Sequence, residues 1–362
     1  MKSIFIVVII NLVCLGLIHN PALADEGTFT LCANRTYNIR YDVTINKIII
    51  MCYIDKLNTP FHIVDPMTLE VNKTFNLNGF VAQVNSLGTG SSLLISVGEN
   101  DGNRSTKEGK LIELDYATGE NIRSMLYNQS LSEMTIDYSQ ENAYITTIGE
   151  EYNNPDKVLK VSLVSFQVLD EVIFGELTDD IEIMPDGSTI YVDSINIYPE
   201  HPSARVQGIG VFRTLDMTRV KRFSLPTPAG LMEMSDDGLK LFIASNNYLE
   251  TDWGADLFII DTQTDEITRK LRFYYNGMET ATYSLAYCGQ NNKLYCTAEP
   301  KTDYTYRRSN LILELDLTDY SYSFFTMGNN PLSRIALAEY DGYKRLFAIE
   351  ESTPVVHWKD LP

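Results

Sequence analysis

Seven short apolar strands of similar shape recur along this chain of 362 residues, each after a tight polar turn. Their first residues are separated by steps of 45, 50, 47, 51, 53 and 52 residues. The strand cores are Ile48–Ile50, Leu93–Ile95, Ala143–Ile145, Ile190–Val192, Leu241–Ile243, Leu294–Cys296 and Leu346–Ala348. A period of roughly 40 to 50 residues built only from short strands is typical of a β-propeller.

The rest of each repeat also reads as strands and turns. Asp186-Gly187 and Asp237-Gly238 precede two of the cores, and glycine there supplies the positive φ of a hairpin turn. A third strand follows, and several end on an aspartate such as Asp261, whose carboxylate can accept a backbone N–H two residues on. We therefore expect an all-β fold, a seven-bladed β-propeller of four-stranded antiparallel blades.

Two segments carry a resemblance to a known family. Residues 184–192 read MPDGSTIYV and residues 257–264 read LFIIDTQT. They resemble the YVTN-type β-propeller repeat, which belongs to the quinoprotein amine dehydrogenase-like propeller superfamily. The resemblance extends over residues 27–362 and implies a scaffold of the kind found in exported, cell-surface and periplasmic proteins. Because such a family is defined by its scaffold, the resemblance carries little information about the ligand.

The last repeat contains three strands rather than four, near residues 333–340, 344–349 and 354–359. An open sheet edge would leave backbone N–H and C=O groups unpaired. The segment Thr28–Leu31 precedes the first blade and has the composition of a strand. We predict that this N-terminal strand pairs with the last blade and closes the ring.

The first 24 residues have the pattern of a signal peptide. Lys2 is followed by an apolar run over Ile4–Leu17 and by Ala22-Leu23-Ala24, a cleavage site with small residues. A membrane anchor is the alternative, but the run is shorter than the roughly 20 residues that a span needs. We expect residues 1–24 to be removed and residues 25–362 to form a single β-propeller domain that is secreted, periplasmic or extracellular, with no membrane span.

The formal charge is −19 at pH 7, which argues against nucleic acid and anionic membranes as partners. Four cysteines remain after cleavage, and in an exported chain they favour two disulfides, with three possible connectivities. We predict one bond between Cys288 and Cys296, which flank a short hairpin, and one between Cys32 and Cys52. Four sequons could accept N-glycans, at Asn34, Asn72, Asn103 and Asn128.

A polar residue follows the second strand of several repeats, where long and often acidic loops begin. Ring geometry would bring these residues to one mouth, and long loops on a rigid scaffold concentrate binding residues. The predicted ligand site consists of Glu99, Glu150, Asp193, Asn246, Glu299 and Glu350, with Tyr248 and Trp253 at its rim. Carboxylates near a channel could hold a divalent cation such as calcium. A solvated acidic face without a site is the alternative.

Catalytic motifs are scarce: the sequence has no G-x-S-x-G, H-E-x-x-H or P-loop pattern. The first interpretation is an exported, non-catalytic binding scaffold that presents an acidic loop face to an extracellular protein, a glycan or a small ligand. A metal-dependent hydrolase or lyase, with carboxylates at the channel mouth, is the alternative. A redox accessory subunit is a third interpretation, favoured only if the gene neighbours a dehydrogenase.

Overall fold

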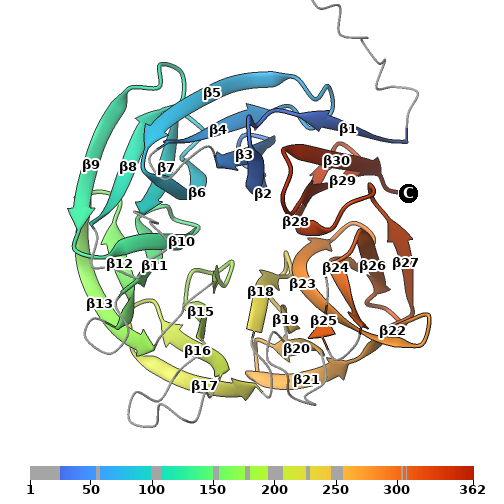
Figure 1. The fold of residues 1–362 in the computed structure, drawn as a ribbon. Coiled ribbons are helices and arrows are strands. Elements are labelled where there is room, and N and C mark those ends of the chain that lie inside the picture. Colours follow the sequence, from blue (N-terminus) through green and yellow to red (C-terminus); the bar gives the residue numbers. More distant parts are fainter. Residues whose placement is uncertain are drawn as a thin grey trace, which may run out of the picture.

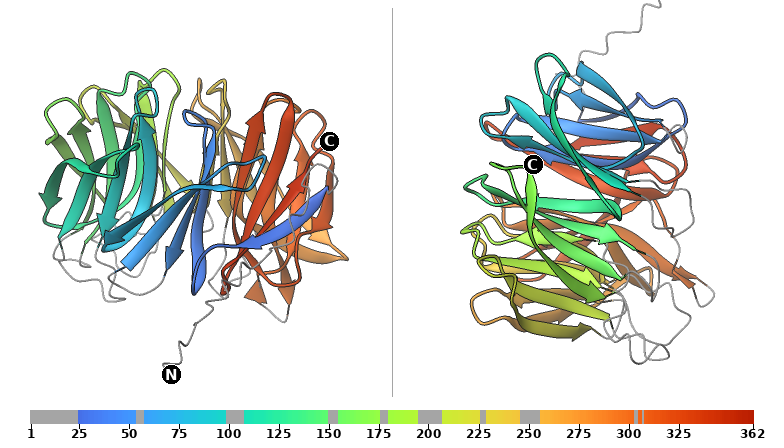
Figure 2. Two further views of the ribbon diagram at one scale, coloured as in Figure 1. Left: turned by 90° about the horizontal axis from the view of Figure 1, so that it is seen from above. Right: turned by 90° about the vertical axis from the view of Figure 1, so that its left-hand side faces the viewer.

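The computed structural model describes residues 25–53, 58–98, 108–149, 155–175, 180–194, 207–225, 229–245, 256–302, 305–306 and 308–362. These residues form seven antiparallel sheets around a central axis, a seven-bladed β-propeller as predicted (Figure 1). Seen from the side, the sheets stand next to one another around a disc (Figure 2). The described residues contain no helix that could cross a membrane. The predicted signal peptide, residues 1–24, lies outside them.

Each blade has four strands. In blades 1 to 6 they follow the sequence order from the channel to the rim, whereas the outermost strand of blade 7 is the N-terminal strand. Blades 1 to 3 comprise β2 (Arg35–Asp42), β3 (Lys47–Tyr53), β4 (Asn58–Val64), β5 (Val71–Asn78); β6 (Phe80–Leu87), β7 (Ser92–Gly98), β8 (Gly109–Asp115), β9 (Asn121–Tyr127); and β10 (Ser130–Ile136), β11 (Asn142–Ile148), β12 (Asp156–Ser162), β13 (Gln167–Gly175).

Blades 4 to 7 comprise β14 (Ile181–Ile183), β15 (Thr189–Ser194), β16 (Gln207–Arg213), β17 (Arg219–Leu225); β18 (Ala229–Met234), β19 (Lys240–Ser245), β20 (Leu257–Asp261), β21 (Glu266–Leu271); β23 (Met278–Cys288), β24 (Lys293–Thr302), β26 (Leu311–Asp316), β27 (Tyr322–Thr326); and β28 (Leu332–Tyr340), β29 (Tyr343–Glu350), β30 (Val355–Asp360) with β1 (Glu26–Thr30). Blade 6 also carries β22 (Phe273–Tyr275) beside β23 and β25 (Thr305–Tyr306) beside β24. We call the face on which the second strands end the loop face.

The ring closes as the sequence predicts. Strand β1 pairs antiparallel with β30, from Glu26 opposite Lys359 to Thr30 opposite Val355. The segment after β1 is bonded to the first blade by the Cys32–Cys52 disulfide, which confirms that predicted pair. We call β1, β30 and this disulfide the closing seam. The seam removes the open edge of blade 7 and joins the two ends of the ring.

The apolar core lies between neighbouring blades rather than at the centre of the ring. Ile48 and Ile50 of β3 pack with β29 of blade 7, whereas Ile49 packs with β7 of blade 2. The same division recurs at Leu94, which faces blade 3 while its two neighbours face blade 1. A second strand is thus buried on both faces, which explains why the cores are continuously apolar instead of alternating.

The predicted Cys288–Cys296 disulfide is wrong, because both cysteines are free and buried. In the β23–β24 hairpin Cys288 lies opposite Lys293, and Cys296 lies opposite Leu285. This register puts the two sulfur atoms on opposite faces of the sheet, in different core clusters. The Cys288 thiol donates to Glu339 Oε1 at 2.6 Å, and burial together with that carboxylate raises its pKa to about 12.

A basic side chain of one blade often binds the turn between the third and fourth strands of the next. Lys160 Nζ donates to the carbonyl oxygen of Thr214 at 2.7 Å, and Arg345 Nη1 donates to that of Pro66 at 2.8 Å. Equivalent bonds run from Lys73 to Tyr116, from Arg123 to Leu163 and from Lys221 to Asp265. These charge-assisted bonds fix the rotation of one blade against the next.

Replacing both Cys32 and Cys52 with serine should lower the free energy of unfolding by about 3 kcal/mol, because a closed loop with a sequence separation of 20 residues is released in the unfolded chain. Denaturant titration without reductant measures the loss. Peptide mapping of the unreduced, alkylated protein is the control. It should show Cys32 linked to Cys52, with label on Cys288 and Cys296. A link between Cys288 and Cys296 would contradict the structure.

Arg345→Met should cost about 2 kcal/mol of stability, because it removes the charge-assisted hydrogen bonds that the buried guanidinium group donates to Asp360 and to the carbonyl oxygen of Pro66. Arg345 is 3% exposed, donates to Asp360 Oδ2 at 2.9 Å and stacks on the Trp358 ring at 4.1 Å. Arg219→Met, on exposed β17, is the matched control and should change stability by less than about 0.5 kcal/mol. Equal effects of both variants on the denaturation midpoint would refute the role given to Arg345.

Candidate functional site

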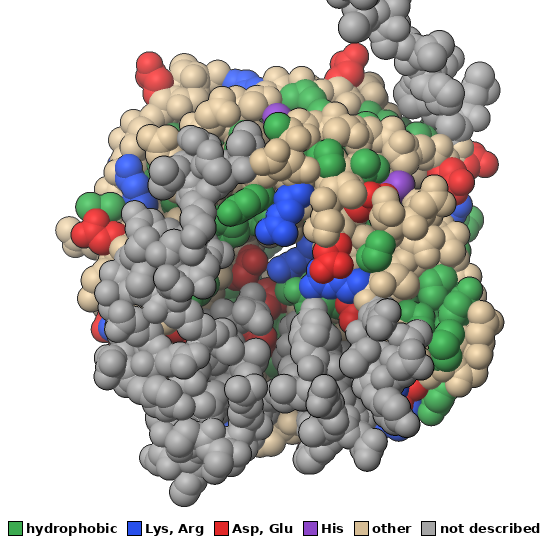
Figure 3. Space-filling model, viewed as in Figure 1, with side chains coloured by type: hydrophobic (Ala, Val, Ile, Leu, Met, Phe, Trp, Pro, Cys, Tyr) green, Lys and Arg blue, Asp and Glu red, His purple; other side chains and the backbone are tan. Residues whose placement is uncertain are grey.

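A cavity of about 500 Å³ occupies the centre of the ring and is lined by residues from the innermost strands of all seven blades. Acidic and basic side chains gather around the hollow in the middle of the face shown in Figure 3. Ligand sites of proteins are concave and commonly have volumes of roughly 300 to 1,000 Å³. The channel is therefore the candidate functional site.

The register of the blades places seven residues at one level of the channel. Each pairs with the middle residue of its strand core, as Arg40 does with Ile49 and Glu233 with Phe242. From blade 1 to blade 7 this level consists of Arg40, Asn85, Thr135, Glu182, Glu233, Ala286 and Ala336. The two alanines are buried in the apolar cores between blades, so at this level blades 6 and 7 contribute no polar side chain.

A second level lies nearer the loop face, where the inner strands are irregular. The register shifts near the start of six inner strands, those of blades 1, 2, 3, 5, 6 and 7. Bulges of this kind turn side chains away from the regular alternation. Glu133 lies in the bulge of β10, Arg334 adjoins the bulge of β28, and Asp180 precedes β14; all three line the cavity.

The charges around the channel are segregated. Both guanidinium groups, Arg40 and Arg334, come from β2 and β28, the inner strands of the blades joined by the closing seam. The carboxylates of blades 3 to 5 come from the opposite arc, which Figure 1 locates by β10 and β18. They are Glu133, Asp180, Glu182, Glu233 and Asp236, and a sixth lining carboxylate, Glu339, belongs to β28. At each of the two levels the basic and acidic residues therefore lie on different sides, and at these levels the channel is dipolar across its width.

Two carboxyl groups of the acidic side are strongly perturbed. Burial raises the pKa of Glu233 to about 8, and the charge of Asp180 adds to the shift. Burial also raises the pKa of Glu182 well above its ordinary value, followed by repulsion from Asp180 and Glu233. Arg40 opposes the shift at both groups through its positive charge. Although both side chains border the channel, they are surrounded by protein, so their charges are poorly compensated.

Arg40 is held in place by one of its nitrogens only. Its Nη1 donates to Asn85 Oδ1, and Asn85 Nδ2 in turn donates to the carbonyl oxygen of Met134 at 3.3 Å. Its Nε is buried and has no hydrogen-bond partner among the described residues. A buried donor without a partner costs about 1–3 kcal/mol. Because Nε is enclosed, an anionic group in the channel would meet the positive charge of the Arg40 side chain, which lines the cavity, rather than this donor.

Some lining residues also hold adjacent inner strands together. Asp180 Oδ2 accepts the backbone N–H of Met232 at 2.6 Å, and Ser284 Oγ accepts that of Ile335 at 3.1 Å. Asp180 is itself fixed by Asp193 of β15, whose Oδ1 accepts the Asp180 N–H at 2.6 Å. Asp193, predicted as a site residue, is completely buried and positions a channel residue from behind.

Glu299 and Glu350, also predicted as site residues, lie at the loop-face ends of β24 and β29. Burial raises the pKa of Glu299 to about 7, while Arg308 at 3.6 Å opposes the rise. Burial would raise the pKa of Glu350 too, but hydrogen bonds from Thr353, His357 and Asn330 outweigh it and the pKa is lowered. These two carboxylates are thus engaged by their own surroundings. The other predicted members, Glu99, Glu150, Asn246, Tyr248 and Trp253, lie outside the described residues, so the ring of six stays a prediction.

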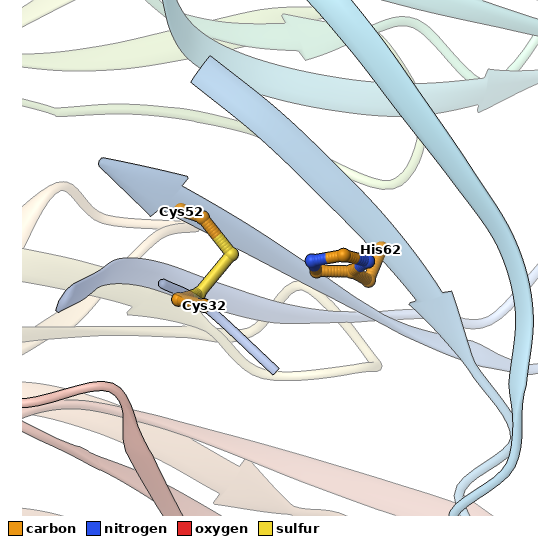
Figure 4. Close-up of side chains that lie close together, drawn as sticks. All are labelled: Cys32, Cys52 and His62. Atoms are coloured by element: carbon orange, nitrogen blue, oxygen red, sulfur yellow. A yellow bond between two sulfur atoms is a disulfide. The ribbon is translucent and has the colours of Figure 1, made fainter. Parts of the chain in front are cut away.

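One cluster has metal-binding residue types. Cys32 Sγ, Cys52 Sγ and a ring nitrogen of His62 lie within 4.8 Å of one another (Figure 4). The two sulfur atoms are bonded to each other, so neither is a thiolate ligand in this state. His62 Nδ1 is hydrogen-bonded to Thr74 Oγ1 at 2.8 Å. Within the described residues this is the one such group of three, so the channel carboxylates do not converge on a point that a single ion could occupy.

No protein-family model matches the sequence, and no curated protein matches it. Solved propellers do match the fold. The β-propeller domain of Cps50 (Swd1) from Myceliophthora thermophila superposes with a TM-score of 0.67 and 10% identity, covering 93% of this chain and 100% of that one. Hydrazine synthase of Kuenenia stuttgartiensis superposes with a TM-score of 0.67 and 13% identity, covering 89% and 94%. These likenesses establish the β-propeller fold and nothing about the ligand.

Glu233→Gln should make the protein more stable at pH 8, on the order of 2 kcal/mol, and leave it nearly unchanged at pH 5. A carboxyl group whose pKa is raised by folding binds more protons in the folded state. Stability therefore falls as the pH rises from about 4.5 towards 8. The amide imitates the protonated acid and removes that fall. Because the pKa values of Glu182 and Glu299 are also raised, the stability of the variant keeps some dependence on pH.

The measurement is denaturant titration at pH 5, 6, 7 and 8. Glu266→Gln, on the exposed strand β21, is the matched control and should follow the unmodified protein. Asp180, Glu133, Asp236 and Arg40 face the perturbed pair, so their charges must be kept in every variant. Parallel pH profiles for Glu233→Gln and the unmodified protein would refute the assignment.

Proposed function

We propose that this chain is a binding scaffold that holds a small charged ligand in its central channel. The observation that carries the proposal is the charged channel: two guanidinium groups and six carboxylates line one cavity at the centre of the ring, and five of the six carboxylates come from blades 3 to 5. Folding gains nothing from enclosing such groups with imperfect partners, because each buried charge has to give up its hydration. A bound ligand of complementary charge would restore those interactions.

We further propose that the protein is exported after removal of residues 1–24 and that its repeats are of the YVTN type. Three of the four sequon asparagines, Asn34, Asn72 and Asn128, are exposed, as glycan acceptors have to be. Asn103 lies outside the described residues. In that setting the loop face presents the channel mouth to extracellular small molecules, glycans or proteins.

Thermal unfolding of the purified protein with a panel of small molecules tests the proposal. The panel contains charged compounds (amino acids, polyamines and dicarboxylates), neutral sugars, and calcium or magnesium chloride. At least one charged compound should raise the melting temperature, since binding to the folded state stabilises it by about 2.7 kcal/mol at 100 times Kd. The shift should shrink in Arg40→Gln or in the Glu182→Gln, Glu233→Gln double variant and persist in Glu266→Gln.

Other outcomes count against the proposal in different ways. Stabilisation by neutral sugars alone, unchanged in the channel variants, would place the ligand elsewhere. Stabilisation by calcium or magnesium that requires Glu182 and Glu233 would favour the metal-dependent alternative. If no compound in the panel shifts the melting temperature, the proposal of a small charged ligand is contradicted. A protein partner that binds the loop face is then the better interpretation.

A further inference from the structure

We infer that the ligand of the channel is an elongated zwitterion, with a cationic end that binds Glu182 and Glu233 and an anionic end that binds Arg40. This inference rests on the proposed function and specifies the chemical class of the ligand. A purely cationic ligand would leave Arg40 without an added anion, and a purely anionic ligand would meet the repulsion of the six carboxylates that line the cavity. Only a molecule that carries both charges satisfies both sides of the channel.

The arrangement of blades requires the charges to be far apart along the ligand. Arg40 belongs to blade 1, and Glu182 and Glu233 belong to blades 4 and 5 of a ring of seven, so the two sides face each other across the axis. An α-amino acid carries its two charges on neighbouring atoms and can satisfy one side only. A chain with an amine at one end and a carboxylate at the other reaches both.

The polar residues on the two sides of the channel differ in the way that such a ligand requires. On the basic side, Arg40 lines the cavity, and its guanidinium group is held by one hydrogen bond, from Nη1 to Asn85. Guanidinium nitrogens suit carboxylates and phosphates because they offer parallel donors. On the acidic side, Glu182 and Glu233 occupy the same level as Arg40, so a straight molecule lying across the channel meets all three.

Part of the channel wall is uncharged. Ala286 and Ala336 of blades 6 and 7, which belong to the apolar cores between blades, line the cavity together with Leu285 and Ile335. Such a stretch suits a short methylene chain between two charged ends. The cavity of about 500 Å³ has room for a molecule of this size.

Isothermal titration calorimetry with matched C6 compounds tests the inference. The probes are 6-aminohexanoate, its isomer norleucine with adjacent charges, hexylamine with only the cation, and hexanoate with only the anion. We expect 6-aminohexanoate to bind at least tenfold more tightly than each of the other three. Because this comparison uses the unmodified protein, it stays decisive even if a channel variant fails to fold.

Variants then assign the two ends. In Arg40→Gln, 6-aminohexanoate should lose its advantage over hexylamine, and in the Glu182→Gln, Glu233→Gln double variant it should lose its advantage over hexanoate. The advantage should persist in Glu266→Gln. If hexylamine or hexanoate binds the unmodified protein as tightly as 6-aminohexanoate, the zwitterion is refuted while a charged ligand in the channel survives. If none of the four binds, the inference fails, and the panel of amino acids, polyamines and dicarboxylates decides separately whether the channel binds any charged ligand.

Discussion

The closing seam is the constraint on which the rest of the molecule depends. A propeller has no central apolar core, so each blade is stable only against its two neighbours, and an unclosed ring would leave blades 1 and 7 half-packed. Pairing of β1 with β30 and the Cys32–Cys52 bond remove that defect. The seam also joins the two blades whose inner strands carry Arg40 and Arg334, so closure brings the basic side of the channel together.

The interfaces between blades combine two kinds of interaction with different tasks. Apolar contacts from both faces of the second strands supply most of the stabilisation but are non-directional. The bonds from basic side chains such as Lys160 and Arg345 to turn carbonyls are directional and act at the outside of the ring. Side chains such as Asp180 and Ser284 do the same near the axis. Because these bonds fix the blades against one another both at the outside of the ring and near the axis, the channel residues keep a constant separation.

The sequence predicted the ring because second strands are buried on both faces, which leaves a continuous apolar signal such as Leu93–Ile95 at every repeat. It did not predict the channel. Glu182 and Glu233 each stand between apolar residues, in Ile181-Glu182-Ile183 and Met232-Glu233-Met234. That alternation is typical of a strand with one face in solvent. The local sequence does not distinguish a side chain on the outer surface from one that lines an internal channel. The Cys288–Cys296 prediction failed because the residue opposite Cys296 is Leu285, three positions before Cys288, and this odd offset puts the two sulfur atoms on opposite faces.

The energetics of the channel link folding to binding. With no ligand bound, uptake of protons by Glu182 and Glu233 relieves their repulsion, so the empty channel binds protons near neutral pH. A cationic group that enters the acidic side takes over that role and displaces protons into solvent. Binding of a cation should therefore strengthen as the pH rises towards 8, whereas stability of the free protein weakens over the same interval. The same charges that lower the stability of the empty ring thus supply the differential affinity that a ligand can use.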